Sequence, residues 1–93
     1  MSDRRLEVFR EVAKFLSFTK AAHALKMTQP AVTFQIRHLE NRLNAKLFSR
    51  AHNRVVLTEE GIVVLECANS IFDKYAEMEK RVKLLQTKEA KVA

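Results

Sequence analysis

The 93-residue sequence is poor in glycine, proline and cysteine, with one residue of each, and it has no tryptophan. So few helix breakers, together with 47% hydrophobic residues, indicate one all-helical globular domain rather than a disordered segment. A single cysteine excludes an internal disulfide framework and favours a cytoplasmic protein, in which we expect Cys67 to be an inert small apolar residue. No apolar run approaches the roughly 20 residues of a membrane span, and the polar start is unlike a signal peptide, so no membrane partner is expected.

Acidic residues are scarce in the middle of the chain. Between Val12 and Thr58 there are eight basic residues and one acidic residue, a net charge of +7, whereas the rest of the chain carries −1. A basic block of this kind is typical of a protein that binds a polyanion. His23, His38 and His52 are far apart and lack acids or cysteine at ligand spacing, and no nucleophile has a credible base. The sequence therefore predicts no catalytic site, no metal and no cofactor.

The only proline lies at the front of a strongly helical segment, "MTQPAVTFQIRHLENRL" (27–43). Thr28 is a good N-cap, and Pro30 is then the second helical residue, where an amide would have no partner inside the helix. The apolar residues recur at the spacing of one buried helix face: Val32, Ile36, Leu39 and Leu43. The opposite face carries Pro30, Phe34 and Arg37, flanked by Gln29 and Thr33. An exposed phenylalanine would be a liability on a purely structural helix.

Three further segments read as regular structure before and after this helix. A helix is expected over 3–16, with an apolar arc wide enough to pack against two neighbours, and a short one over 18–25, capped by Ser17. The short helix and the 28–43 helix, joined tightly at residues 26–27, describe a helix-turn-helix. Residues 47–57 change to the period of a strand around the turn-forming pair 52–53, which predicts a small hairpin, or wing, tipped by Arg54.

A fourth helix, capped by Thr58, is expected from Glu59 to Leu85, followed by a frayed polar tail. Seven apolar or aromatic residues of this helix follow one another at intervals of four and three residues in turn, which is the spacing of the a and d positions in a coiled coil. They are Val64, Ala68, Ile71, Tyr75, Met78, Val82 and Leu85. The strict 3.5-residue period favours an interface between two copies of the chain over a long core helix. A second stripe, Leu65 and Phe72, can pack on the chain's own core.

The segment "SFTKAAHALKMTQPAVTFQIRHLENRLNAKLFSRAHNRVVLTEEG" resembles the N-terminal DNA-binding region of LysR-type transcriptional regulators. The resemblance covers residues 3 to about 86 and lies in the ordered pieces "TQPAV", "QIRHLE", "LFSR" and "LTEEG". It implies a winged helix-turn-helix in residues 1–58, a linker helix in 59–86 that forms a homodimer, and a polar tail in 87–93. It also implies a missing C-terminal domain that alone would bind a small-molecule effector, and a higher oligomer of the full-length protein.

The same resemblance implies which residues bind double-stranded promoter or operator DNA. The recognition helix, 28–43, would enter the major groove and the wing, at 50–56, would approach the minor groove of an inverted-repeat operator. The DNA-binding residues are then Thr28, Gln29, Pro30, Thr33, Phe34, Arg37, Arg50 and Arg54. Their chemistry fits, because glutamine pairs with adenine, arginine with guanine, and an apolar ring contacts the thymine methyl group. The chain departs from the family at Phe34, where members often carry a polar or basic residue.

Three other interpretations remain at this point. A non-specific nucleoid-type packaging protein would carry a diffuse lysine excess, which this sequence lacks. A purely structural dimerisation module would leave the +7 block unexplained. The nearest alternative is the winged-helix domain of a molybdate-responsive regulator, which a C-terminal sequence would distinguish.

Overall fold

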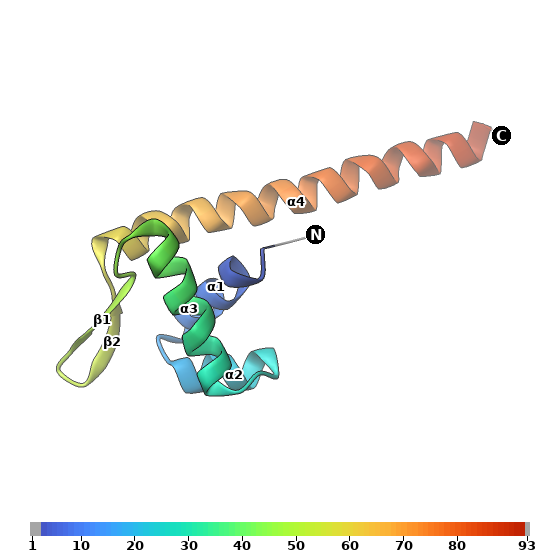
Figure 1. The fold of residues 1–93 in the computed structure, drawn as a ribbon. Helices are drawn as coiled ribbons and strands as arrows, with labels where there is room; N and C mark the ends of the chain where they lie inside the picture. The colour runs from blue at the N-terminus through green and yellow to red at the C-terminus, as the bar shows by residue number, and fades with distance from the viewer. Residues whose placement is uncertain (1–2, 93) are drawn as a thin grey trace.

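The computed structural model describes residues 3–92 of the chain. The elements, in chain order, are α1 (Arg4–Phe15), α2 (Phe18–Leu25), α3 (Gln29–Leu43), β1 (Phe48–Ala51), β2 (Arg54–Leu57) and α4 (Glu59–Val92). Figure 1 shows the first three helices gathered under the start of α4, with the hairpin projecting to one side and the rest of α4 extending away. The molecule measures 61 × 26 × 21 Å. The expected fold, a mostly helical domain with a small hairpin and a long last helix, is confirmed.

Capping residues mark both ends of α1, α2 and α3. The side chains of Asp3, Ser17 and Thr28 are the N-caps, and each accepts a hydrogen bond from a backbone N–H in the first turn of its helix. The turn of the helix-turn-helix has no glycine, and Lys26 instead adopts the left-handed conformation at φ 56°. The Met27 N–H donates to the Ala22 carbonyl at 2.9 Å, which closes the end of α2.

The core lies where α1, α2 and α3 meet, beneath the first turns of α4. Its buried residues are Val8, Phe9, Val12, Ala21, Ala22, Val32, Ile36, Leu39 and Leu47. The helix α1 packs against α2, α3 and α4, which confirms that its wide apolar arc serves more than one neighbour. The prediction for Leu43 was wrong, because its side chain is 47% exposed. The chain turns at Asn44, and Leu47 fills the core after the turn.

The wing is a two-stranded antiparallel hairpin with a two-residue turn. Phe48 pairs with Leu57 and Ala51 pairs with Arg54, which leaves His52 and Asn53 as the turn. Both turn residues have positive φ, at 52° and 61°, as a type I′ turn requires. The turn predicted at residues 52–53 is therefore confirmed, and Arg54 lies directly after it.

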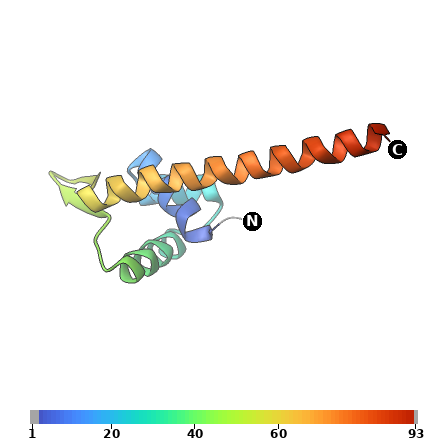
Figure 2. The same cartoon turned by 90° about the horizontal axis from the view of Figure 1, so that it is seen from above.

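The long helix α4 begins at a tight junction with the wing. The Thr58 hydroxyl donates to the Lys46 carbonyl at 2.6 Å and accepts the Gly61 N–H at 3.0 Å, so it caps the helix as expected. The expected end at Leu85 was wrong, because the helix continues to Val92. The extra residues are mostly good helix formers, with no glycine or proline to stop the helix. Figure 2 shows how far α4 passes beyond the other helices.

The predicted seam on α4 divides between the chain's own core and solvent. Ala68 is fully buried within the single chain, and Val64 is partly buried against the core. This corrects the assignment of Ala68 to an interface between two copies, because the first turns of α4 pack on α1 and leave no Ala68 surface exposed. Ile71, Met78, Val82 and Leu85 are exposed, and Tyr75 is half-buried. Cys67 also lies exposed on this helix.

Candidate nucleic-acid interface

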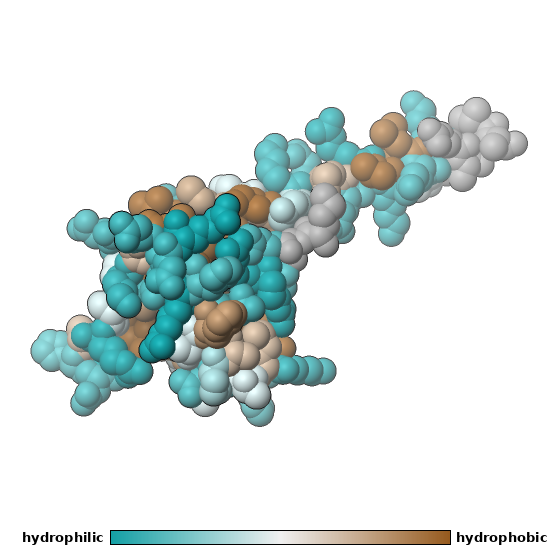
Figure 3. All heavy atoms as spheres, viewed as in Figure 1, coloured by the Kyte–Doolittle hydropathy of each residue, from teal (hydrophilic) through white to brown (hydrophobic). Residues whose placement is uncertain are grey.

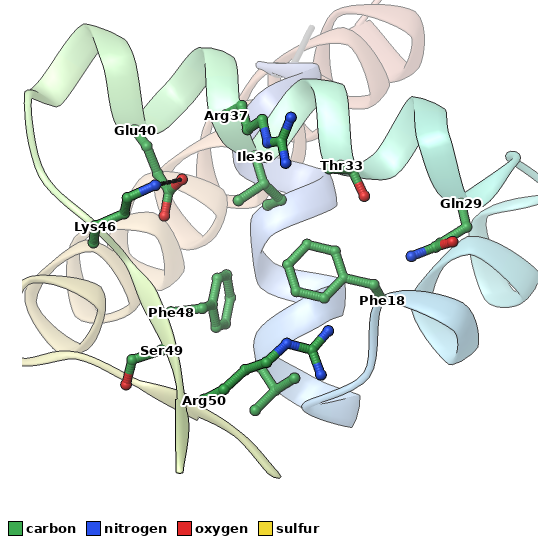
Figure 4. A pocket seen from close by; sticks show the side chains of 11 residues that line it. Phe18, Gln29, Thr33, Ile36, Arg37, Glu40, Lys46, Phe48, Ser49 and Arg50 are labelled. Carbon is green, nitrogen blue, oxygen red and sulfur yellow. Dashed lines mark ion pairs between the residues drawn. The ribbon is translucent and has the colours of Figure 1, made fainter. Parts of the chain in front are cut away.

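A groove of about 440 Å³ separates α3 from the wing. Its lining residues come from α2, α3, the following loop and both strands: Phe18, Gln29, Thr33, Ile36, Arg37, Glu40, Lys46, Phe48, Ser49, Arg50 and Val55. Figure 4 shows Gln29, Thr33 and Arg37 along one side and Arg50 reaching up from the wing on the other. The rings of Phe18 and Phe48 lie between them and contact edge to face, with centroids 5.7 Å apart. The groove therefore has an aromatic floor and polar or basic walls.

Three predicted reading residues form one row on α3. Gln29, Thr33 and Arg37 are four residues apart, so they lie one above another on the same side of the helix. Gln29 and Arg37 are exposed and Thr33 is half-buried. The sequence grouped Arg37 with Pro30 and Phe34, whereas the structure brings Arg37 into the row that lines the groove. The reason is that helical periodicity shows which side faces the core but not where the wing lies.

The charged residues of the groove are basic except for Glu40, whose carboxylate stabilises a loop. Glu40 is only 9% exposed, and it accepts a hydrogen bond from the Leu47 N–H at 2.8 Å. Its other oxygen lies 3.9 Å from the Lys46 ammonium. Glu40 therefore holds the loop between α3 and β1 in place. Among residues 3–92, no carboxylate forms an ion pair with the guanidinium group of Arg37 or Arg50, so the groove favours an anion.

A second hollow, of about 420 Å³, continues from the groove towards the tip of the wing. Arg50, Asn53 and Arg54 line it from the hairpin, and Ser17 and Thr19 line it from the start of α2. The first turn of α2 has backbone N–H groups without partners inside the helix, which carry partial positive charge. Two arginines opposite a helix start make a surface suited to phosphate oxygens.

Phe34 and His38 lie on α3 but do not line either hollow. Phe34 is 66% exposed, and its ring stacks on the His38 imidazole with centroids 6.0 Å apart and planes at 16°. The Arg5 guanidinium reaches from α1 to within 3.5 Å of His38 Nδ1.

The same guanidinium group also contacts Asp3, the N-cap of α1. Partial burial of Asp3 favours its neutral acid form, but the hydrogen bonds from Arg5 have the larger combined effect and hold the pKa of Asp3 below its ordinary value.

The remaining predicted residues, Thr28 and Pro30, flank Gln29 in the sequence but line neither hollow. Thr28 and Pro30 are exposed at the start of α3, where the Thr28 hydroxyl accepts the Ala31 N–H at 3.2 Å. Sequence reasoning did not assign the groove residues Lys46 and Ser49 to this site, or Thr19 of the second hollow. Lys46 belongs to the basic block, which was its only signal. Ser49 and Thr19 carried none, because only the packing of the wing beside α2 and α3 brings them to the same surface.

Among the described residues, 3–92, histidine, cysteine and acidic side chains form no group of three or more that could hold a metal ion. Within the same residues, no helix is long and apolar enough to cross a membrane.

A helix-turn-helix whose second helix presents glutamine, threonine and arginine beside a basic hairpin defines a DNA-binding domain of the winged helix-turn-helix class. Residues 4–62 match the family described as "Bacterial regulatory helix-turn-helix protein, lysR family". The chain belongs to this family, as its sequence motifs imply, and the molybdate-responsive alternative is set aside.

Relatives of known sequence are transcriptional regulators. The chain is 41% identical over 86 residues to the RuBisCO operon transcriptional regulator of Allochromatium vinosum, a match that covers 92% of this chain and 28% of that protein. It is 44% identical over 72 residues to the HTH-type transcriptional activator AmpR of Yersinia enterocolitica, covering 77% of this chain and 24% of that protein. The chain thus spans about a quarter of the length of these curated relatives.

Solved structures share the fold over nearly the whole chain. A BenM_DBD/benA site 1 DNA complex superposes with a TM-score of 0.84 at 33% identity, covering 91% of this chain and 96% of that chain. A CbnR_DBD–DNA complex superposes with a TM-score of 0.82 at 32% identity, covering 90% and 97%. A structure of CbnR, a LysR family transcriptional regulator, gives a TM-score of 0.80 at 32% identity, and there the match covers 89% of this chain but only 29% of that chain.

Proposed function

We propose that this chain binds double-stranded DNA sequence-specifically, with the first half of α3 in the major groove. The observation that carries the proposal is the row of Gln29, Thr33 and Arg37 beside a basic hairpin. In a helix-turn-helix, the N-terminal residues of the second helix contact base edges. Glutamine can pair with adenine through two hydrogen bonds, and arginine can do the same with guanine. The threonine hydroxyl can form a hydrogen bond with either base. The BenM and CbnR DNA complexes, which share the fold, support DNA binding by this domain.

The wing supplies the second contact. Arg54 directly follows the turn of the hairpin and is exposed, so it can enter a minor groove beside the major groove that α3 occupies. A narrow A·T-rich minor groove has the most negative potential and attracts arginine most strongly. Arg50 lies further from the tip, between the two hollows, and is suited to a backbone phosphate. Thr28 and Pro30 allow the start of α3 to approach the DNA backbone closely.

Phe34 is proposed to contact a thymine methyl group. Its ring is largely exposed, next in sequence to Thr33, and no core residue covers it. Apolar contact with the C5-methyl group is the way in which such a side chain distinguishes thymine in the major groove. Contact with a thymine methyl group would remove apolar surface of the Phe34 ring from water, which explains its exposure in the free protein.

Dimerisation through α4 is part of the same proposal. Beyond the head of the molecule, Ile71, Met78, Val82 and Leu85 leave an apolar stripe exposed, and Tyr75 is half-buried beside it. Figure 3 shows hydrophobic atoms between hydrophilic ones along the projecting part of α4. A second copy would bury this stripe, and its two-fold symmetry would present two copies of α3 to an inverted repeat. Val64 and Ala68 contribute to the chain's own core at one end of that seam.

The assignment of residues 1–58 to DNA binding, 59–86 to dimerisation and 87–93 to a connection belongs to this proposal as well. The relatives are longer, so a C-terminal effector-binding domain and a higher oligomer are proposed for the full-length protein. The family resemblance supports both. A regulator of this kind acts on the genome, which is why we infer a cytoplasmic location. We propose no enzymatic activity, because the relatives are transcriptional regulators.

The test is to select bound duplexes from a random library with this 93-residue protein and then titrate the best duplex at several salt concentrations. We expect an enriched inverted repeat. About six to eight phosphates neutralised per protomer should give a log–log salt slope of roughly −5 to −7 per protomer. No enriched sequence, or an affinity that is the same at low and at physiological salt, would contradict the proposal.

A further inference from the structure

Four side chains, from the start of α1 and from α3, form a connected group at the edge of the proposed DNA surface. Asp3 holds the Arg5 guanidinium, with its Oδ2 atom 3.3 Å from Arg5 Nη2 and its Oδ1 atom 3.4 Å from Arg5 Nε. The remaining terminal nitrogen of Arg5, Nη1, lies 3.5 Å from His38 Nδ1. His38 in turn stacks on Phe34, four residues earlier on α3. The order from α1 outwards is therefore Asp3, Arg5, His38 and Phe34.

The contact with Arg5 favours one tautomer of a neutral His38 ring. A guanidinium group has only donors, so Arg5 can lie favourably against Nδ1 only when that nitrogen is an unprotonated acceptor. The proton of a neutral imidazole is then on Nε2. Two nitrogens of the Arg5 guanidinium, Nε and Nη2, donate to the two oxygens of the Asp3 carboxylate. This two-point contact restricts rotation of the guanidinium group. Arg5 is thus a fixed support against which the imidazole ring rests.

A fixed imidazole limits the positions of the phenyl ring. An exposed phenylalanine on a helix has more than one accessible rotamer, and stacking against a ring one turn along favours the rotamer that keeps the two planes nearly parallel. Discrimination of thymine depends on van der Waals contact with one methyl group, and this attraction falls steeply when a gap opens. The position of the phenyl ring therefore affects the base preference directly.

We propose that Arg5 and His38 are positioning residues for Phe34, and that this group sets the strength of the thymine preference at the base pair that Phe34 meets. The inference rests on the proposed function, because it assumes that α3 reads bases. It adds that a residue of α1, outside the recognition helix, controls specificity at one base pair. Arg5 is half-buried and pairs with Asp3, so its effect is on geometry rather than on the overall attraction to DNA.

The experiment compares the base preferences of variants with those of the wild-type 93-residue protein in a random duplex library. Phe34→Ala first identifies the base position that depends on the phenyl ring. Arg5→Met should then weaken the thymine preference at that position by about two- to tenfold, the range expected for loss of an aromatic pair's geometry, and leave the other positions unchanged. The matched control is Arg4→Met. Arg4 is on the same turn, carries the same charge and pairs with Glu7 at 3.2 Å, so its loss should change affinity uniformly and no base preference.

His38→Leu provides a second test at an exposed site. If circular dichroism shows that Arg5→Met does not fold, the His38→Leu variant alone tests the inference. It should weaken the same position by a similar factor. The inference is overturned if the folded variants at positions 5 and 38 leave that preference intact, or if Arg5→Met and Arg4→Met act alike at every position. It is also overturned if Phe34→Ala changes no position. A wild-type protein that enriches no sequence at all would instead overturn the proposed function.

Discussion

Gly61 stands in the first turn of α4, where a methyl group has no room. A Cβ atom there would overlap the Leu47 carbonyl oxygen and lie 2.9 Å from Cδ2 of Leu57. The Leu47 backbone cannot easily yield, because its N–H donates to Glu40 at 2.8 Å and its carbonyl accepts the Thr58 N–H at 3.0 Å. Replacement of Gly61 by alanine should therefore force apart α4 and the base of the wing.

The size of the effect follows from two opposing contributions. Alanine in place of glycine in a helix is ordinarily worth about 1 kcal/mol in favour of folding. Overpacking a close contact costs about 1–3 kcal/mol, and the upper part of that range applies when the obstacle is backbone held by two hydrogen bonds. The net result for Gly61→Ala is a loss of about 1–2 kcal/mol. For a domain of this size, such a loss lowers the Tm by about 4–15 °C.

Thermal unfolding followed by far-UV circular dichroism measures this loss. Ser70→Ala is the matched control, because Ser70 is exposed on the same helix and its replacement changes helix propensity without a new contact. The control should keep or slightly raise the Tm. If Gly61→Ala also raised the Tm, the close approach of Leu47 to α4 would be refuted.

Three further predictions concern DNA binding and assembly. Gln29→Ala and Thr33→Ala should each relax preference at one base pair per half-site, at a cost of about 1–3 kcal/mol in competition binding, with an unchanged Tm. A strongly lowered Tm, with an unchanged base preference in the fraction that remains folded, would show that the row faces the core. Arg54→Ala should weaken binding most on duplexes with A·T-rich flanks, whereas an equal loss on G·C-rich flanks would indicate a phosphate contact. The double variant Ile71→Asp with Met78→Asp should be a folded monomer in sedimentation, since both side chains are exposed, and a wild-type chain that is monomeric at high micromolar concentration would refute the dimer.

The features that the sequence predicted well are those that neighbouring residues determine. The caps at Ser17, Thr28 and Thr58 each satisfy a backbone N–H within three residues of the cap. The turn at residues 52–53 needs two positive φ angles, which asparagine tolerates. Local chemistry of this kind leaves few alternatives, so the helix-turn-helix and the wing could be predicted without knowledge of the packing.

The features that the sequence did not predict depend on residues far apart in the chain. Gly61 is conspicuous only because Leu47 and Leu57 approach it. Arg5 meets His38 across 33 positions, and no periodicity on α3 indicates a partner from α1. Helical spacing likewise placed Gln29 and Thr33 off the core stripe, but the position of the wing decides that Arg37 shares their groove. Long-range packing thus accounts for the parts of the site that could not be derived in advance.

Chemical footprinting of the selected duplex tests the central claim most directly. Methylation by dimethyl sulfate occurs at guanine N7 in the major groove, an acceptor that arginine uses in reading guanine, and at adenine N3 in the minor groove. If α3 enters the major groove with Arg37 at guanine, N7 should be protected in each half-site, and Arg37→Ala should abolish that protection while protection by the wing at flanking adenine N3 persists. Guanine N7 positions that remain fully reactive in the saturated complex would contradict the account.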